Sequence, residues 1–173
     1  SHIAWDSVPR CAADPSQTAK YQLVDGDIVV ARTGASTGRS QWVQTVEPSV
    51  FASYLVRFRT NKEFDSRFVA YVLQTEPWFE HVKSVAQGKS AKPNISARDM
   101  GAFEFSAPGL VEQRAIAEVL GALDDKITAN TRAASAAVNL ARAEYVRAKG
   151  RADDQVVALG TIATTVLGGT PSR

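Results

Sequence analysis

The sequence predicts an α+β fold, in which a globular domain built on a mixed sheet is followed by a long α-helix that forms a coiled coil. Three observations lead to this prediction. Short runs that are β-branched or that alternate in polarity lie between residues 28 and 59, which is typical of strands. A helical spacing of apolar residues begins after Asp65. Residues 111–149 then contain no proline and one glycine, Gly121, as expected of one long helix.

The composition is typical of a globular protein, because 45% of the 173 residues are hydrophobic and 22% are charged. No apolar run approaches the roughly 18 residues that cross a bilayer, and the N-terminus shows no signal peptide. The single cysteine, Cys11, has no partner for an internal disulfide. We therefore expect a cytoplasmic protein with no membrane partner.

Basic residues are in excess in the globular part of the sequence. Residues 31–92 contain nine lysines and arginines against five acidic residues, whereas residues 93–150 contain seven of each. A local excess of this kind is typical of a nucleic-acid surface. An ordinary solvated surface is the alternative interpretation.

Three strands are expected in the first part of the chain. A turn at residues 25–27 precedes a buried strand at residues 28–31, and alternating strands follow at residues 41–46 and 54–59. Together they predict an antiparallel sheet or an irregular barrel.

Helices and one more strand are expected next. Asp65 is a candidate helix cap, and it precedes apolar residues at helical spacing, namely Phe68, Val69, Tyr71, Val72 and Phe79. Ser96 is a candidate cap of a short turn, residues 102–106 are interpreted as a strand, and Pro108-Gly109 ends the globular part.

The long helix carries a heptad seam that predicts pairing with another helix. Its members are Ile116, Leu120, Leu123, Ile127, Asn130 and Ala134. A helix of this length extends about 58 Å, too far to be buried within so small a domain, and Asn130 is a candidate register residue. An amphipathic hairpin folded back on the domain is the alternative.

Two loops are candidate DNA-contacting segments. In the first, Gly34 and Gly38 are separated by three residues and followed by Arg39. A phosphate-binding loop has four residues between its glycines and then a lysine, so this segment does not match one. Small residues between two arginines could still let the chain approach a phosphate. The candidates there are Arg32, Thr33, Ser36, Thr37 and Arg39. A structural turn, or a small nucleotide-binding enzyme that uses the Gly34–Gly38 loop, is the alternative.

The second loop, residues 87–94, is polar and basic. Lys89 and Lys92 are candidate phosphate contacts, and Gln87, Ser90 and Asn94 are candidate hydrogen-bonding partners of base edges. A solvated loop is the alternative. Neither histidine, His2 or His81, belongs to a nucleophile or metal-binding pattern, so no catalytic residue, metal site or cofactor is expected in this chain.

The order of these motifs resembles the specificity subunit of type I restriction–modification systems. The resemblance rests on residues 26–34 with Gly38, on residues 94–96, and on Glu112-Gln113 leading into the helix. It covers essentially residues 20–150, and one proline, Pro108, stands where the family usually has two. Residues 159–163 and 168–173 resemble the opening of a recognition domain, which is consistent with a fragment or with a permuted half-subunit.

The resemblance implies that different segments of the chain have different functions. Residues 1–110 form a DNA target-recognition domain for one half of a split target. Residues 111–150 form the conserved spacer and dimerisation helix, and residues 151–173 begin a recognition domain. The partners implied are double-stranded DNA, methyltransferase subunits that bind S-adenosylmethionine, a restriction and translocation subunit, and a second copy of the chain. The chain itself is then a non-catalytic recognition subunit. A helical scaffold protein with no role on DNA is a further alternative.

Overall fold

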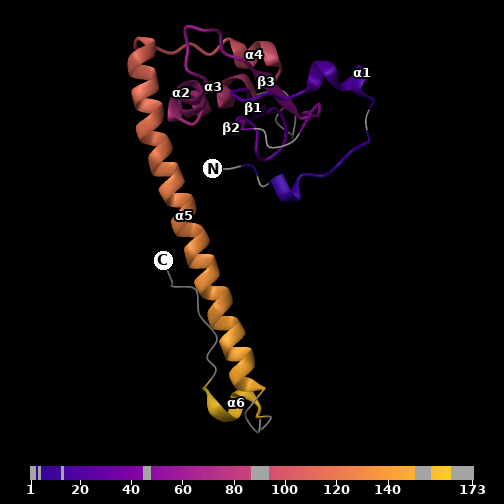
Figure 1. The fold of residues 1–173 in the computed structure, drawn as a ribbon, viewed down its shortest axis with the longest axis vertical. Helices are drawn as coiled ribbons and strands as arrows, with labels where there is room; N and C mark the ends of the chain where they lie inside the picture. The colour runs from indigo at the N-terminus through magenta and orange to yellow at the C-terminus, as the bar shows by residue number, and fades with distance from the viewer. Residues whose placement is uncertain are drawn as a thin grey trace, which may run out of the picture. The chain divides into compact units, whose positions relative to one another are not determined.

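The computed structural model describes residues 3, 5–12, 14–44, 48–86, 94–150 and 157–164. The chain divides into two compact units, residues 1–128 and residues 129–173. The boundary lies inside the long helix α5, Leu110–Lys149, which Figure 1 shows as one continuous coil. The second unit also contains the short helix α6, Leu159–Ile162.

The sheet of the first unit has three described strands in the order β2-β1-β3. These are β1, Ile28–Ala31, β2, Ser40–Trp42, and β3, Leu55–Phe58. Both neighbours pair with β1 in antiparallel register, with Ile28 opposite Trp42 and Phe58. The α+β prediction is therefore confirmed, and β1 has the predicted bounds.

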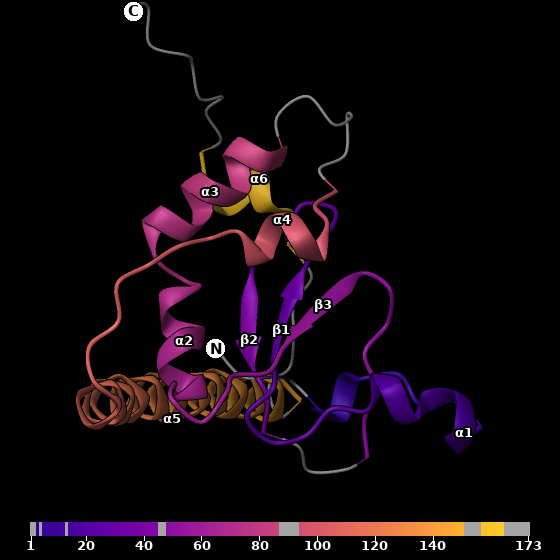
Figure 2. The same cartoon turned by 90° about the horizontal axis from the view of Figure 1, so that it is seen from above.

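Helices of the first unit are short apart from α3 and α5. The N-terminal part holds the 3-10 helices η1, Trp5–Ser7, and η2, Ala19–Tyr21, on either side of α1, Pro15–Thr18. Later come α2, Ser66–Val72, α3, Glu76–Ala86, and α4, Ala97–Gly101. Figure 2 shows that the arrow of β1 points toward α4.

The predicted helix caps are present. The Asp65 carboxylate accepts from the backbone N–H of Phe68 at 2.9 Å, and the Ser96 hydroxyl oxygen accepts from the backbone N–H of Asp99 at 3.0 Å. The apolar residues after Asp65 form two helices, because Pro77 is tolerated only in the first turn of a helix, and α3 therefore begins at Glu76.

The predicted strand at residues 102–106 is wrong. Residues 103–109 form neither helix nor strand. The alternating pattern has another cause, because the rings of Phe103 and Phe105 stack on each other with centroids 5.9 Å apart, and Phe103 also meets Trp78 edge to face. Aromatic packing against the core thus produces the alternation that was interpreted as a strand.

Each face of the sheet is covered by its own apolar cluster. One face packs against α2, α3 and α4, with a buried core of Ile28, Val30, Val56, Ala70, Leu73, Trp78, Val82, Ile95 and Met100. The other face carries Leu23, Val29 and Val43, against which Ile3, Trp5, Phe51 and Leu55 pack. The tip of the segment that joins β1 to β2, Ala35 and Ser36, remains exposed.

Candidate nucleic-acid interface

Three segments that are distant in sequence meet at Arg32, the residue directly after β1. The Arg32 backbone N–H donates to the carbonyl of Tyr54, and its carbonyl accepts from the N–H of Ile95, both at 2.9 Å. Thr33 and Asn94 form an isolated antiparallel bridge. The last residue of the second candidate loop, Asn94, therefore lies beside the start of the first.

The β1–β2 loop, residues 32–39, is held by hydrogen bonds within itself and to Ala31 at the end of β1. The Thr37 N–H and hydroxyl both donate to the carbonyl of Gly34, at 3.1 and 2.6 Å. The Gly38 N–H donates to Ala31 and the Arg39 N–H to Ser36, at 2.8 and 2.9 Å. A phosphate-binding loop needs free backbone amides, and three successive amides here are already used, so a nucleotide site in this loop is disfavoured.

The stem of the same loop is anchored in the core at Gly38. The indole Nε1 of the fully buried Trp78 donates to the Gly38 carbonyl at 2.7 Å. Gly38 has a φ of +86°, and a Cβ there would lie 2.9 Å from a methyl of Val82. Both the backbone conformation and the close approach of Val82 therefore require glycine at this position. The contacts with Trp78 and Val82 of α3 fix the point at which the loop leaves the sheet.

The candidate residues differ in their exposure. Ser36, Arg39 and Asn94 are exposed, whereas Arg32, Thr33 and Thr37 are half-buried. Within the described part of the chain, the buried Nε of Arg32 has no hydrogen-bond partner, and such a nitrogen can donate to a bound group. The other four candidates, Gln87, Lys89, Ser90 and Lys92, lie outside the described residues.

Tyr54 is a surface residue of this region that the sequence analysis did not single out. Its side chain is 69% exposed, and its carbonyl is bonded to Arg32. The sequence feature that could have identified Tyr54 as a surface residue is its position at the start of a predicted strand, directly after a loop. An exposed aromatic ring can stack or hydrogen-bond with nucleic acid.

The opposite end of the sheet carries an ion pair between a buried aspartate, Asp27, and an exposed arginine, Arg59. Asp27 is fully buried, and its carboxylate accepts from Arg59 Nε at 2.7 Å, from Arg59 Nη2 at 2.9 Å and from the Val24 N–H at 2.9 Å. Burial tends to raise the pKa of Asp27, but the hydrogen bonds and the charges of Arg59 and Arg57 outweigh it and hold that pKa below its usual value. This carboxylate holds the turn after Val24 in place.

The predicted helix seam is only partly covered. Ile116 and Leu120 are half-buried, Leu123 and Ile127 are 53% and 62% exposed, and Asn130 and Ala134 are exposed. The buried residues of α5 are instead Gln113, Ala117 and Gly121. The helix thus has one stripe that faces its own domain and a second, apolar stripe beside it.

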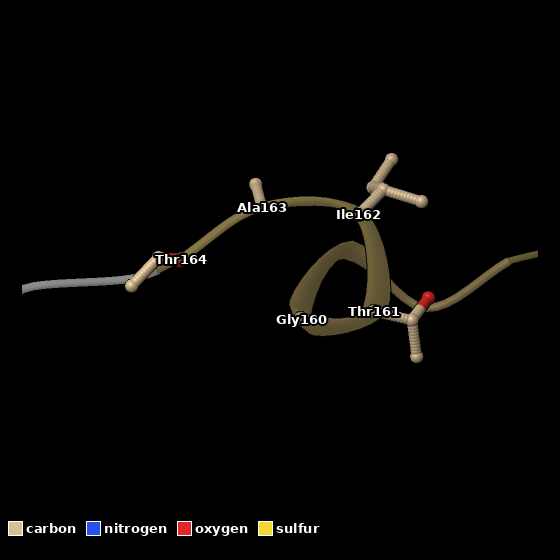
Figure 3. Close-up of a pocket in the computed structure, with 5 residues that line it drawn as sticks. All are labelled: Gly160, Thr161, Ile162, Ala163 and Thr164. Carbon is tan, nitrogen blue, oxygen red and sulfur yellow. The ribbon is translucent and has the colours of Figure 1, made fainter.

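Other places in the described residues offer little chemistry. A hollow beside α6, drawn in Figure 3, is lined by Gly160, Thr161, Ile162, Ala163 and Thr164, and the Thr161 hydroxyl donates to the carbonyl of Ala158 at 2.6 Å. No cluster of three or more metal-ligating side chains occurs in the described ranges. None of the described helices combines the length and the apolar character needed to cross a membrane.

Comparison with known proteins identifies the family. Residues 14–139 match the family model of the type I restriction modification DNA specificity domain. The comparison with curated proteins finds no match. Because the family match covers more than half of the chain and includes both the sheet and most of α5, the protein belongs to the family of type I restriction modification DNA specificity domains.

Proposed function

We propose that this chain reads one half of a split DNA target through the surface where residues 32–39, Tyr54 and Asn94 meet. Membership of the specificity-domain family gives a role in DNA target recognition. The choice of this particular surface is supported by the bridge between Thr33 and Asn94. This bridge joins two loops that were each identified from the sequence as candidate DNA-contacting segments.

The roles proposed for the side chains follow from their chemistry. Arg32 and Arg39 contact phosphates, which contribute affinity independent of sequence. Ser36, Thr37 and Asn94 supply the short polar groups that hydrogen-bond to base edges, while Thr33 and Tyr54 line the same surface. In the neighbouring loop, Lys89 and Lys92 add phosphate contacts and Gln87 and Ser90 add base contacts.

The proposed role of α5 is that of a spacer and docking element. Leu123 and Ile127 expose apolar side chains in two successive turns, and such a stripe favours a partner helix. We propose that it pairs with a second recognition unit, or with another copy of the chain, and positions methyltransferase and restriction subunits. In this proposal the chain is non-catalytic, S-adenosylmethionine binds to the methyltransferase subunit, and the complex acts on DNA in the cytoplasm.

Two other functions are less well supported. A nucleotide-binding enzyme would need amides of the Gly34–Gly38 loop, but the N–H groups of Thr37 and Gly38 already donate to the carbonyls of Gly34 and Ala31. A helical scaffold with no role on DNA does not account for the specificity-domain match, which begins well before α5.

The test is to express the chain with its methyltransferase subunits and to sequence the methylated sites. We expect one two-part motif, with two short specified halves separated by unspecified bases. Methylation without any shared sequence, or no association between the chain and the methyltransferase, would contradict the proposal.

A further inference from the structure

The stripe by which α5 contacts its own domain is made of polar and small residues. Gln113 is only 2% exposed. Its Oε1 accepts from the Asp65 backbone N–H at 3.0 Å, and its Nε2 donates to the carbonyl of Pro108 at 2.8 Å. One side chain therefore ties the first turn of α5 both to the start of α2 and to the segment that leads into the helix.

A second contact follows two turns later, at Gly121. The guanidinium of Arg67, from α2, lies against the helix so closely that a Cβ at Gly121 would overlap it. The same guanidinium lies 5.1 Å from the ring centroid of Trp42 in β2. The indole Nε1 of Trp42 donates to the Ser66 hydroxyl at 3.0 Å, so this contact connects the sheet, α2 and α5.

The third contact lies one turn further along. The Tyr71 hydroxyl donates to the Asp124 carboxylate at 3.1 Å, and burial together with this hydrogen bond raises the pKa of Tyr71. From Gln113 to Asp124 the helix rises about 16 Å. Contacts spread over this length fix the direction of a helix, whereas a single contact would leave a pivot. Both Figure 1 and Figure 2 show α2 beside this part of α5.

We propose that Gln113, Gly121 and Asp124, packed against α2, act as a joint that sets the gap between the two halves of the DNA target. This inference rests on the proposed function. Residues 110–128 extend about 28 Å, so a change of about 7° in their direction displaces the far end by about 3.4 Å, the length of one base-pair step. A rigid joint therefore permits one gap, and a loose joint permits several.

The experiment compares methylated motifs made by variants of the full chain, assembled with the methyltransferase subunits. In Gly121→Leu the new side chain displaces Arg67 from the helix, while leucine favours helix more than glycine does. The matched control is Ala122→Leu, at an exposed position of the same turn that does not face α2 or the seam. Sequencing the methylated sites reports both the specified bases and the number of bases between the halves.

The expected result is a change in the gap without a change in the bases. The parent and Ala122→Leu should methylate one gap length. Gly121→Leu should methylate the same two halves and, in addition, gaps one or two base pairs longer or shorter, with at least about a tenfold gain at those sites over the parent. Methylation by Gly121→Leu at the parent's gap alone would overturn the inference.

A second variant keeps the test decisive if Gly121→Leu does not fold. The double variant of Gln113→Met and Tyr71→Phe removes the hydrogen bonds to α2 and introduces no overlap, and the same gap measurement is applied to it. If this double variant methylates only sites with the same gap as the parent, the inference is likewise overturned. Failure of the proposed function has a different signature, because the parent itself would then give no two-part motif.

Discussion

Buried polar side chains fix this small domain at points where apolar packing alone would allow movement. Asp27 is paired with Arg59 at one end of the sheet, and the Trp78 indole holds Gly38 at the other. Gln113 satisfies two backbone groups at the base of α5. None of these three roles is visible in the sequence, since each partner is distant along the chain; Gln113 and Asp65 are 48 residues apart.

Replacement of Asp27 should lower stability and alter its dependence on pH. The folded pKa of Asp27 lies below its usual value, so the ion pair stabilises the fold above about pH 4 and this contribution is lost as pH falls through the folded pKa. At pH 7, Asp27→Asn should reduce the free energy of unfolding by about 1–3 kcal/mol. Urea unfolding between pH 3 and pH 7 measures both effects.

The control for this prediction is Asp125→Asn, which removes an exposed carboxylate from α5. It should change the free energy of unfolding by less than about 0.5 kcal/mol. Equal stability of Asp27→Asn and the parent at pH 7 would show that the ion pair makes no net contribution to the free energy of unfolding.

Removal of the Arg39 side chain should weaken DNA binding on every sequence by a similar factor. A lost phosphate contact reduces the slope of log affinity against log salt by about one unit. Titration of fluorescent duplexes at several salt concentrations measures this slope. Lys62→Ala is the matched control, because Lys62 is exposed and follows β3 at the opposite end of the sheet. If Arg39→Ala keeps the same slope of log affinity against log salt as the parent, Arg39 does not contact a phosphate.

Secondary structure with a local cause was predicted well. The β-branched run of β1, the caps at Asp65 and Ser96, and the length of α5 each depend on residues adjacent in sequence. The interpretation failed at residues 102–106, where the aromatic alternation reflects packing on Trp78, and the break before α3 was not predicted. The stripe of α5 that meets α2 was also missed, because Ala117 and Gly121 give no apolar signal.

Polar substitutions in the exposed seam of α5 should weaken assembly and leave the domain folded. The double variant Leu123→Ser and Ile127→Ser removes two apolar side chains whose burial would stabilise a helix pair by about 1.5–3 kcal/mol each. The dissociation constant of the pair should rise by at least about 100-fold, as measured by sedimentation equilibrium. Val111→Ser, on an 84% exposed residue outside the seam, should have no such effect. An unchanged mass in the double variant would exclude this stripe as the pairing surface.

At the scale of the whole molecule, the order of motifs predicted the family that the comparison identified. Family membership follows from features spread over residues 14–139, which a linear sequence preserves. The proposed DNA-contacting surface is less accessible to sequence reasoning, because the hydrogen bonds of Arg32 to Tyr54 and Ile95 exist only in the folded chain. The roles of individual loop residues therefore stay predictions.

Pairing of two copies of this chain through α5 should give a symmetric target. A two-fold axis between identical recognition domains requires the two halves of the motif to be inverted repeats. Sequencing the sites methylated when this chain is the sole specificity subunit checks this expectation. Two unrelated half-sequences would show that a different recognition domain completes the complex.

The anchoring of the β1–β2 loop has a consequence for how such domains diversify. Its stem is held by Trp78 and Val82, whereas Ala35 and Ser36 at the tip are exposed. Mutations at the tip therefore carry little folding cost. Natural variation or directed evolution can change these two positions freely on an unchanged scaffold, which makes the tip the place to begin when a new target sequence is sought.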